Sequence, residues 1–390
     1  MSDAILVFNA GSSSIKFALF ETSEGGDPRL SCKGLLDEDQ EDPRLVVKDA
    51  GGHILLERQL TQSDAAEGGL FSDVIDWVES RHKALAAIGH RVVHGGRKFT
   101  TAVRVSQEVI EELDGLTPLA PLHQPRCLSP MRKINSLRPH LPQFACFDTA
   151  FHYGIEPPVS RFALPRRFEE IGIRRYGFHG LSYEYIASRL AGLSPALAAA
   201  RTVVAHLGNG ASLCAMQNGR SVDTTMGLTA LDGVVMGTRC GAIDPGVLLY
   251  LQQAMQMSAA DVERLLYRES GLLGVSGISH DVRTLLASDD PRAAEALDLF
   301  AFSVTRQVSA MANSLGGLDC LVFTGGIGEH ASAVRAAICA RLRWLGVELD
   351  SEANNLSKSR ISAKESRIDV RVIPTDEEIM IARHCLTKTR

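Results

Sequence analysis

Three glycine-rich segments, each directly after an apolar run, have the composition of anion-binding turns. They are Gly11–Ser14 (GSSS), Gly208–Gly210 (GNG) and Gly325–Gly328 (GGIG). Glycine permits sharp turns that bring backbone N–H groups close to an anion, and the hydroxyls of Ser12 and Ser14 add donors. Lys16 follows two residues later and can place a cation on a phosphate. One such segment alone is more often an ordinary turn, but three after β-type runs favour phosphate binding.

Two arginines lie in loops bounded by glycine. Arg91 belongs to GHRVVHGG (89–96) and Arg239 to GTRCG (237–241). The planar guanidinium fork fits carboxylate or phosphate oxygens bidentately. Two arginines from separate loops could hold one small anion from two sides. The alternative for each is a surface ion pair that contributes little.

Four more residues carry groups suited to an acid, a donor or a metal site. Asp148 follows the apolar run FACF and is either a turn-capping residue or a functional acid. His179, in RYGFHG, is either a hydrogen-bonded structural histidine or a functional one. Asn9 and Glu377 supply the hard oxygens that Mg²⁺ prefers beside nucleotide phosphates. Glu377 alone would also be explained by the dipole at the start of a helix.

The elements that must position these groups alternate between strands and helices. Apolar runs predict strands at Ala4–Phe8, Ile15–Phe20, Arg44–Val47, His53–Leu56, Ala87–Val93, Phe144–Phe147, Thr202–Leu207, Ala211–Met216 and Cys320–Phe323. Helical spacing predicts helices at Ser72–Glu79, Ser106–Leu113, Ser258–Tyr267, Pro291–Leu315, Ser332–Leu342 and Asp376–Cys385. Ser258 and Thr375 have the residue type of N-caps. The second half repeats the strand, glycine turn and strand of the first, which predicts two similar halves around a cleft.

A proline-rich passage, Thr117–Pro130, interrupts the first half. Each proline removes a backbone donor and restricts the residue before it, so the passage is predicted not to form a regular helix. A surface loop is favoured over a segment that lines a cleft.

Composition excludes several classes of protein. A length of 390 residues predicts two domains, and 45% apolar with 22% charged residues is typical of a globular protein. The net charge, 41 − 46 = −5, and the absence of basic runs give no footprint for nucleic acid. We expect no membrane span and no signal peptide. Eight cysteines without C-x-x-C spacing indicate a reducing cytoplasm and argue against zinc or disulfides. The Walker and dinucleotide glycine patterns are both missing, so a P-loop or Rossmann enzyme is not supported.

Together these motifs resemble the acetokinase family of acetate and propionate kinases, and they follow one another in order along nearly the whole chain. The matching stretches are FNAGSSSIKF (8–17), GHRVVHGG (89–96), APLHQP (120–125), FDTAFH (147–152), RRYGFHG (174–180), AHLGNGAS (205–212), DTTMGLTALDGVVMGTRCGAIDPG (223–246), FTGGIGEH (323–330) and IPTDEEIMIA (373–382).

The resemblance implies an α/β fold of two duplicated actin- and ribonuclease-H-like domains around a nucleotide cleft, as in the acetate and sugar kinase, heat-shock 70 and actin superfamily. Domain I is expected at residues 1–150 with 376–390, and domain II, the nucleotide-binding lobe, at 151–375. The implied activity is reversible transfer of the γ-phosphoryl group of ATP to acetate, giving acetyl phosphate and ADP, with Mg²⁺ or alternatively Mn²⁺. A propionate or other short-chain acyl kinase, an inactive relative and a non-catalytic ATP-binding relative are the alternatives. A cytoplasmic homodimer is expected.

By position, Asn9 and Glu377 match the family's Mg²⁺ ligands, and Arg91 and Arg239 match the arginines that hold the carboxylate and the moving phosphoryl group. His179 matches the histidine that donates to that group. Asp148 matches an active-site acid whose role, as base or as orienting group, stays open.

The resemblance also implies which residues bind the acceptor and the nucleotide. The acceptor's alkyl end is expected beside Val93, Leu122 and Ala230, with His123 near the site. ATP is expected at Lys16, Ser12, Ser14, His206, Leu207, Gly208, Asn209, Gly210, Asp281, Val282, Arg283, Gly326, Ile327, Gly328, Glu329 and His330.

The chemistry is consistent with this set. A carboxylate is already ionised at neutral pH, so attack needs no strong general base. Two like charges about 4 Å apart repel by roughly 4 kcal/mol at an effective dielectric of 20, which cations must offset. We expect direct in-line transfer without an enzyme-bound phosphate, stabilised by prepositioned arginine and histidine donors.

The chain departs from the family's common pattern at six positions. They are Cys240 and Ala242, where Ser and Asp are usual, Ala230 for Pro, His330 for Asn, Gln124 for Asn, and Tyr183 for His. The first two adjoin Arg239, so its loop could be held differently. Loss of the proline ring at Ala230 could admit one more methylene, a difference of about 1–3 kcal/mol in discrimination. The choice between acetate and propionate, and the effect of His330 on the nucleotide, stay open at this stage.

Overall fold

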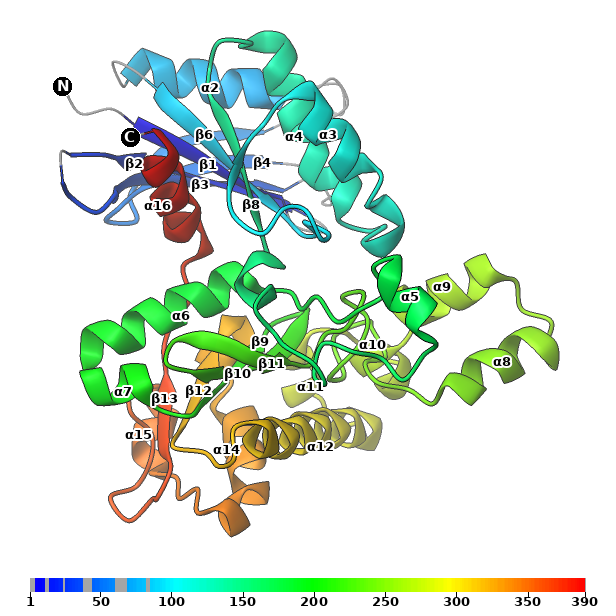
Figure 1. Ribbon diagram of the computed structural model, residues 1–390. Coiled ribbons are helices and arrows are strands. Elements are labelled where there is room, and N and C mark those ends of the chain that lie inside the picture. The colour runs from blue at the N-terminus through cyan, green and yellow to red at the C-terminus, as the bar shows by residue number, and fades with distance from the viewer. Residues whose placement is uncertain are drawn as a thin grey trace. The chain divides into compact units, whose positions relative to one another are not determined.

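The computed structural model describes residues 4–10, 14–23, 25–37, 44–59, 69–81 and 85–389. The chain forms two compact units, Met1–Ala150 with Asp376–Arg390 (unit 1) and Phe151–Thr375 (unit 2). Each contains one mixed β-sheet with helices on its faces (Figure 1). Among helices of the described residues, none combines the length and the apolar character that a bilayer crossing requires.

Unit 1 is built on an eight-stranded sheet of order β5-β4-β3-β2-β1-β6-β8-β7. Its strands are β1 (Ala4–Ala10), β2 (Ser14–Glu21), β3 (Arg29–Asp37), β4 (Arg44–Asp49), β5 (Ile54–Gln59), β6 (Leu85–Val92), β7 (Val103–Arg104) and β8 (Gln143–Phe147). Its helices are α2 (Gly69–Arg81), α3 (Gln107–Asp114), η1 (Thr117–Leu119), α4 (Gln124–Leu137) and α16 (Glu377–Thr389), with η2 (Ala150–His152) at the boundary of the units.

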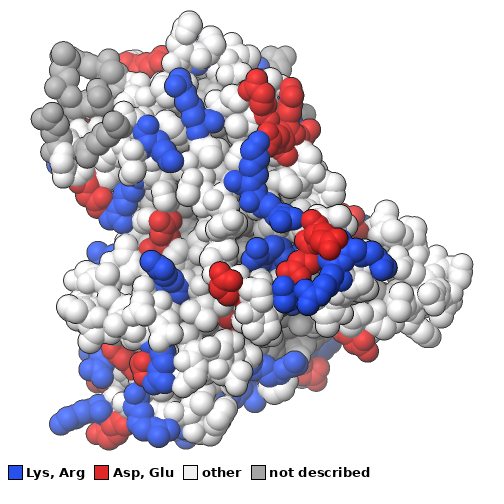
Figure 2. All heavy atoms as spheres, viewed as in Figure 1, with Lys and Arg blue, Asp and Glu red and all other residues white. Residues whose placement is uncertain are grey.

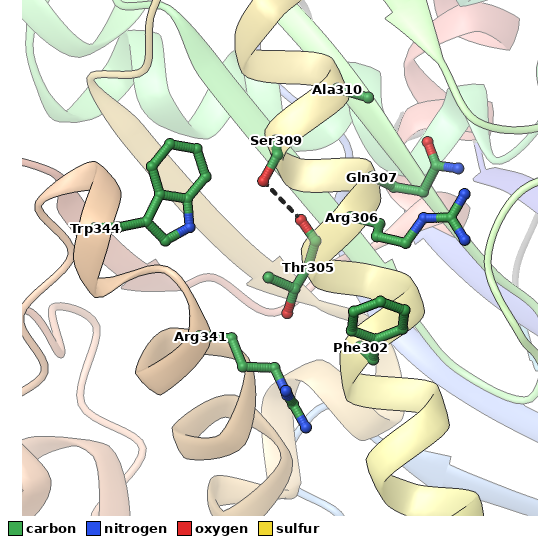
Figure 3. Close-up of a pocket in the computed structure, with 8 residues that line it drawn as sticks. All are labelled: Phe302, Thr305, Arg306, Gln307, Ser309, Ala310, Arg341 and Trp344. Carbon is green, nitrogen blue, oxygen red and sulfur yellow. Dashed lines mark hydrogen bonds between the residues drawn. The ribbon is translucent and has the colours of Figure 1, made fainter.

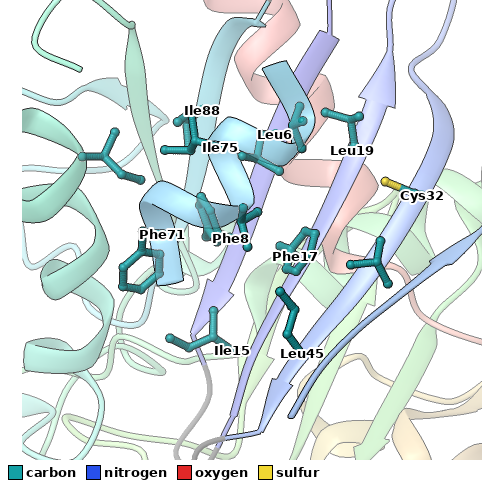
Figure 4. Close-up of a cluster of buried hydrophobic side chains, with 14 of the residues drawn as sticks. Leu6, Phe8, Ile15, Phe17, Leu19, Cys32, Leu45, Phe71, Ile75 and Ile88 are labelled. Atoms are coloured by element: carbon teal, nitrogen blue, oxygen red, sulfur yellow. The ribbon is translucent and has the colours of Figure 1, made fainter. Parts of the chain in front are cut away.

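The two faces of this sheet have different covers. Leu6 and Phe8 of β1 pack with Phe71 and Ile75 of α2 in a buried cluster that also includes Phe17 (Figure 4). The opposite face receives α16, from the far end of the chain, which packs on β1 and β6. Side chains of a strand alternate between faces, so the even-numbered residues of β1 face α2 and the odd-numbered ones face α16.

Unit 2 has a five-stranded sheet of order β11-β10-β9-β12-β13. Its strands are β9 (Thr202–Leu207), β10 (Ala211–Gln217), β11 (Arg220–Thr224), β12 (Cys320–Thr324) and β13 (Asp369–Val372). Its helices are α5 (Arg166–Glu170), α6 (Gly180–Leu193), α7 (Pro195–Ala199), α8 (Pro245–Gln253), α9 (Ala259–Arg268), α10 (Gly271–Ser276), α11 (Val282–Leu286), α12 (Pro291–Ser314), α13 (Gly325–His330), α14 (Ser332–Arg341), η3 (Arg343–Leu345) and α15 (Ser351–Asn355). One face of the sheet packs on α6, and α12 covers the other (Figure 1).

The two sheets share a five-strand topology. In unit 1, β3-β2-β1 are antiparallel, and β6 and β8 follow β1 in parallel. In unit 2, β11-β10-β9 are antiparallel, and β12 and β13 follow β9 in parallel. The duplication predicted from the repeated strand, turn and strand is therefore present in the fold.

Three local predictions are wrong. The passage Thr117–Pro130 is not a loop, because η1 and the first half of α4 occupy it and Cys127 and Leu128 are buried. Pro125 lies in the first turn of α4, where its missing N–H has no intrahelical partner anyway, and buried Pro130 is accommodated inside the helix. Gly325–His330 forms α13 rather than an open glycine turn.

The third error concerns the N-cap of the last helix. The Asp376 carboxylate, not Thr375, accepts the N–H of Ile379, at 2.9 Å. The Ser258 cap of α9 is confirmed by its bond from the Asp261 N–H.

On the face shown in Figure 2, Lys and Arg are interspersed with Asp and Glu. Several charged side chains of the described residues form exposed pairs, such as Arg161 with Glu169 and Arg264 with Asp261. Pairs of this kind contribute little to stability.

Candidate active site

The register of unit 1 places Asn9 and Arg91 on one face, at the carboxyl ends of neighbouring parallel strands. Val7 of β1 pairs with Gly89 of β6, and Gly89 lies directly against α16. A strand period of two therefore puts Asn9 and Arg91 on this same face, beside the start of α16. Glycine at position 89 is required for this close approach, because an added Cβ would lie 2.4 Å from a side-chain carbon of Ile381.

Arg91 and Asp148 form a nearly buried bidentate ion pair. Arg91 Nε donates to Asp148 Oδ1 at 3.0 Å and Nη2 donates to Oδ2 at 2.6 Å. The exposed side-chain fractions are 14% and 1%. Burial lowers the pKa of Arg91, but the charges of Asp148 and Glu377 outweigh it and raise the pKa well above its ordinary value. Both oxygens of Asp148 are engaged with Arg91, as expected of a group that orients the guanidinium.

Asn9 links this pair to the start of α16. Its Oδ1 accepts from Arg91 Nη1 at 3.2 Å, and its Nδ2 donates to Glu377 at 3.1 Å and to Glu378 at 2.9 Å. Burial raises the pKa of Glu378, and the charge of Glu377 raises it further. Sequence reasoning missed Glu378, because a second glutamate in the first turn of a helix is an ordinary feature.

Lys16, Ser12 and Ser14 were predicted to bind phosphate around the first glycine turn. Lys16 is exposed and lies opposite Asn9 in the β1–β2 ladder. Its charge lowers the pKa of Glu378. Ser12 lies outside the described residues, and of Ser14 only the backbone is described, as the first residue of β2.

The donor set around Asn9 fits Mg²⁺ by chemistry, since it consists of carboxylate and amide oxygens. No three His, Cys, Asp or Glu side chains of the described residues gather into a group that could hold a metal alone. Mg²⁺ at nucleotide sites commonly uses one or two carboxylates together with phosphate oxygens and water. Asn9 and Glu377 therefore fit an ion that binds together with a nucleotide, not a preformed metal cage.

In unit 2, His179 is fixed between strand and helix. It adopts the left-handed conformation (φ 58°) directly before α6. Its ring stacks on that of His206, with centroids 4.3 Å apart and planes 17° apart. Its Nδ1 hydrogen-bonds Ser212 Oγ at 2.8 Å, and Ser212 is the direct cross-strand neighbour of His206.

Gly210 brings His179 and Arg239 together. A Cβ added at Gly210 would lie 2.8 Å from Arg239 Nη2 and 3.6 Å from His179 Nε2. Arg239 Nη1 donates to the carbonyl of Ala230 at 2.7 Å. The missing side chain of Gly210 therefore leaves the space in which the guanidinium and the imidazole approach each other.

The loop of Arg239 interlocks with the glycine turn after β9. The Gly237 N–H donates to the Asn209 carbonyl at 2.9 Å, and a Cβ at Gly237 would lie 1.9 Å from Asn209 Oδ1. Leu207 is buried at the end of β9, and the Gly208 N–H donates to Gly210 O at 3.1 Å.

Cys240 and Ala242, the two departures from the family pattern beside Arg239, lie in a loop that is held by backbone hydrogen bonds. The Cys240 N–H donates to Leu266 O at 3.2 Å, the Ala242 N–H donates to Gly233 O at 2.9 Å, and Arg239 O accepts from the Met236 N–H at 3.1 Å. These bonds do not depend on the side chains at 240 and 242. The Cys240 thiol donates to the neighbouring Gly241 O, and burial raises its pKa.

The third glycine segment, α13, follows β12. Gly325 (φ +76°) lies against the backbone of Leu207. Glu329 Oε1 accepts from the Gly325 N–H at 2.9 Å and from the Thr375 N–H at 3.1 Å. A Cβ added at Gly326 would meet open space. Ile327 is half-buried, Gly328 is buried, and His330 is exposed.

A buried arginine supports α13 from α14. Arg335 is fully buried and its Nη1 donates to Gly328 O and Glu329 O, both at 2.9 Å. Its Nε and Nη2 hold Asn354 at 2.8 and 2.7 Å. The carbonyl end of the glycine segment is thus fixed by a side chain that the sequence did not single out.

The remaining predicted residues have structural explanations of their own. Asp281 caps α11 by accepting from the Arg283 N–H and pairs with the exposed Arg283 side chain, while Val282 is buried. Val93 is buried, and Leu122 and His123 are half-buried just before α4.

Gln124, another of the six departures, is fully buried at the start of α4. Its side-chain amide nitrogen, Nε2, donates to His94 O at 3.0 Å and to Leu113 O at 3.1 Å. Gln124 therefore ties α4 to α3 and to the loop after β6.

A groove of about 550 Å³ lies elsewhere in unit 2, between α12 and the end of α14. Phe302, Arg306, Arg341 and Trp344 are among its lining residues (Figure 3). None of the described residues that line it belongs to the predicted site.

Arg91 belongs to unit 1 and Arg239 to unit 2, so the two-sided grip on one anion stays a prediction. The same holds for the acceptor pocket, whose residues Val93 and Leu122 lie in unit 1 and Ala230 in unit 2. Within each unit, however, the structure does assemble groups: Asn9, Arg91 and Glu377 in one, and His179 and Arg239 in the other.

Two α/β units with one repeated strand order define a duplicated actin-like protein of the acetate and sugar kinase, heat-shock 70 and actin superfamily, as predicted. A propionate kinase from Francisella tularensis has a similar structure, with a TM-score of 0.88, 36% sequence identity and coverage of 98% of both chains. Porphyromonas gingivalis acetate kinase gives a TM-score of 0.86 at 34% identity over the whole of both chains.

Residues 4–383 match the Acetokinase family, and the chain belongs to that family. A protein named acetate kinase from Rhodopseudomonas palustris CGA009 is 53% identical over 391 residues, which cover 98% of each chain. Another of that name, from Methylocella silvestris, is 49% identical over 99% of this chain and 98% of its own. The family resemblance drawn from the motifs is confirmed.

Proposed function

We propose that the protein is an acetate kinase, which transfers the γ-phosphoryl group of ATP reversibly to acetate and releases ADP. The observation that carries the proposal is the near-complete match to relatives of that name at up to 53% identity. An acetate oxygen attacks the γ-phosphorus, the bond to the bridging oxygen breaks, and its electrons remain on ADP. No enzyme-bound phosphate is needed.

In unit 1, we assign acceptor recognition to Arg91. Its guanidinium is kept charged and oriented by Asp148, so it can offset the repulsion between a carboxylate and a phosphate. Asp148 is the orienting group in this assignment, because acetate has no proton to lose at neutral pH. Val93, Leu122 and His123 are assigned to the acceptor pocket together with Ala230.

In unit 2, we assign transition-state stabilisation to His179 and Arg239, which meet at Gly210. Donors fixed before the reaction stabilise charge on the equatorial phosphoryl oxygens without reorganisation. Residues 206–210, 281–283 and 326–330, with Lys16, Ser12 and Ser14, are assigned to ATP. Domain I, 1–150 with 376–390, and domain II, 151–375, are the corresponding lobes.

Mg²⁺ is the proposed metal, with Mn²⁺ as a substitute, and Asn9 and Glu377 would hold it, Glu378 lying beside them. When bound, the ion neutralises phosphate charge. Asn9 would bind the ion through Oδ1, which now accepts from Arg91 Nη1 at 3.2 Å. Activity is expected to require Mg²⁺, and Glu377→Gln is expected to raise the Mg²⁺ concentration needed for half-maximal rate. An unchanged requirement would contradict the assignment.

The decisive experiment is a trapping assay with ATP, Mg²⁺, acetate and hydroxylamine, which converts acetyl phosphate to a hydroxamate. We expect hydroxamate in the wild type, and a loss of orders of magnitude in Arg239→Met. Wild-type protein that binds ATP but forms no hydroxamate with acetate or propionate would support a non-catalytic role instead.

We also propose a homodimer in which a second copy covers α8. None of the residues of α8 is buried, although its sequence is PGVLLYLQQ, and Leu249 and Tyr250 are 54% and 62% exposed. Leu249→Glu is expected to give monomers in sedimentation velocity, whereas Leu193→Glu, at an exposed leucine of α6 (51%), is a control that keeps the dimer. A monomeric wild type would refute the proposal.

The eight free thiols, seven of them buried, suit the cytoplasm expected from the sequence.

A further inference from the structure

A buried chain of hydroxyls leads from α6 to the imidazole of His179. Tyr183 Oη lies 2.5 Å from Ser212 Oγ, and Ser212 Oγ lies 2.8 Å from His179 Nδ1. We propose that Tyr183 is a positioning residue: acting through Ser212, it keeps the proton of His179 on Nε2, the nitrogen beside Gly210 and Arg239. The inference rests on the proposed function for the use of that proton, but not for its location.

The backbone sets the spacing of this chain. Tyr183 lies one helical turn after His179, and its N–H donates to the His179 carbonyl at 3.1 Å. Ser212, on β10, projects from the sheet face that packs on α6, as does its cross-strand neighbour His206. The first turn of a helix and one strand residue are therefore enough to connect the three side chains.

Counting hydrogens determines the direction of the bonds. Among the described residues, Ser212 is the one hydrogen-bond partner of the Tyr183 hydroxyl, so the tyrosine must donate to it or leave its hydrogen buried and unpaired. Tyr183 is fully buried, and burial above all raises its pKa well beyond the ordinary value, so this hydrogen is always present. Within the described chain, Ser212 then has one acceptor for its own hydrogen, the Nδ1 of His179. With Nδ1 accepting, a neutral imidazole carries its proton on Nε2.

The surroundings keep the ring from turning over. His179 stacks on His206, whose own Nδ1 is bonded at 2.8 Å to Ser182, and Ser182 is bonded at 2.8 Å to Thr375. The ring of Tyr183 is itself packed edge-on against His152, with centroids 5.5 Å apart. A flipped His179 ring would lose the Ser212 bond, and Ser212 would keep an unused hydrogen.

The consequence is chemical. With the proton on Nε2, His179 presents a hydrogen-bond donor to the space left by the missing side chain of Gly210. Arg239 Nη2 borders the same space. Without the tyrosine hydrogen, Ser212 is able to accept from Nδ1–H, and the alternative tautomer directs a lone pair to that place. A lone pair there would repel phosphoryl oxygens instead of binding them.

The test compares Tyr183→Phe with Tyr176→Phe. Tyr176 is also buried in unit 2 and donates to a backbone carbonyl, Gly172 O, at 2.8 Å, so its variant loses a similar bond outside the relay. The first readout is the ¹⁵N spectrum of histidine-labelled protein without substrates, with the His179 signals identified by their loss in His179→Gln. We expect Nε2–H in the wild type and in Tyr176→Phe, and a mixture of tautomers in Tyr183→Phe.

Kinetics gives the second readout. We expect kcat to fall about tenfold in Tyr183→Phe, the order of one hydrogen bond to an oriented group, with KM for ATP changed less than about twofold. Ser212→Ala should lose as much, and adding Tyr183→Phe to it should cost nothing more, since coupled residues are non-additive. A wild-type signal from Nδ1–H, or additive effects in the double variant, would overturn the proposal. If no acyl phosphate forms at all, the spectrum still decides the relay, while the proposed function alone fails.

Discussion

Replacing Arg91 by methionine should destabilise unit 1 strongly, because it removes the positive charge that compensates the buried Asp148 carboxylate. Methionine keeps an unbranched apolar stem at this position and removes the charge. Asp148 is only 1% exposed and is held by bonds of 2.6 and 3.0 Å from Arg91. Removing one partner of a buried ion pair costs about 3–5 kcal/mol. With a urea m-value of roughly 2 kcal/mol per molar, the midpoint of unit 1 should fall by about 1.5–2.5 M.

The two tryptophans of the chain allow unit 1 to be followed alone. Trp77 lies in α2 of unit 1 and Trp344 in η3 of unit 2. In a Trp344→Phe background, fluorescence during urea unfolding reports on unit 1. Adding Asp148→Asn to Arg91→Met should restore most of the lost stability, because the stranded charge is removed, while activity stays lost.

The control is Arg138→Met, which breaks a pair with Asp76 that is 34% and 55% exposed. Its loss should be below about 1 kcal/mol. The reasoning fails if Arg91→Met loses no more than this control, or if Asp148→Asn gives no recovery in the Arg91→Met background. In either case the pair would not be a buried, mutually dependent unit.

Four further predictions follow from separate features. Arg239→Lys should lower kcat by about 10²- to 10³-fold with little loss of stability, measured by hydroxamate formation and urea unfolding; a near-normal rate would exclude a role in the transition state. Burial lowers the pKa of His90 and of His152 to about 4, so both side chains are neutral in the folded protein at neutral pH. The same groups titrate at about 6.5 in the unfolded chain. The free energy of unfolding should therefore fall by about 3 kcal/mol for each histidine as the pH is lowered from about 6.5 toward 4. Urea midpoints that stay constant from pH 6.5 to 4.5 would contradict this. Arg335→Lys should raise KM for ATP about tenfold and change kcat little, because a point charge cannot replace the fork at α13; an unchanged KM would separate Arg335 from the nucleotide. Ala230→Val should reduce kcat/KM for propionate about 10- to 200-fold more than for acetate, and equal losses would place Ala230 outside the acceptor pocket.

The strands that carry the site were predictable because they are fully buried apolar runs bounded by glycine. β1 and β9 were found nearly to their ends, and the repeated turn after them indicated the duplication that the common strand order confirms. β13 was missed because its sequence, DVRV, has only four residues, too few for the alternation to stand out. The proline-rich passage was misread because propensity ignores burial: Cys127 and Leu128 are buried in α4.

The candidate site residues were predictable as residue types, and their partners in the structure were not. A resemblance to known motifs indicates Arg91 and His179, but the bonds from Asp148 and Ser212 depend on tertiary packing. Glu378 and Arg335 gave no signal above that of an ordinary helical charge, since their importance comes from burial. Sequence patterns identify reactive side chains near glycine turns more readily than they identify the partner residues that orient those side chains.

Unit 1 is built from two separate stretches of the chain, residues 1–150 and 376–390, so it cannot be completed until synthesis ends. Residues 151–375 are contiguous and contain the whole of unit 2, whereas α16, which covers β1 and β6, is translated last. Until then the first 150 residues leave the ribosome with one apolar sheet face bare, and only the final helix brings Glu377 to Asn9. A chain truncated before residue 377 would therefore be a ready substrate for chaperones and proteases, even though its second unit is complete.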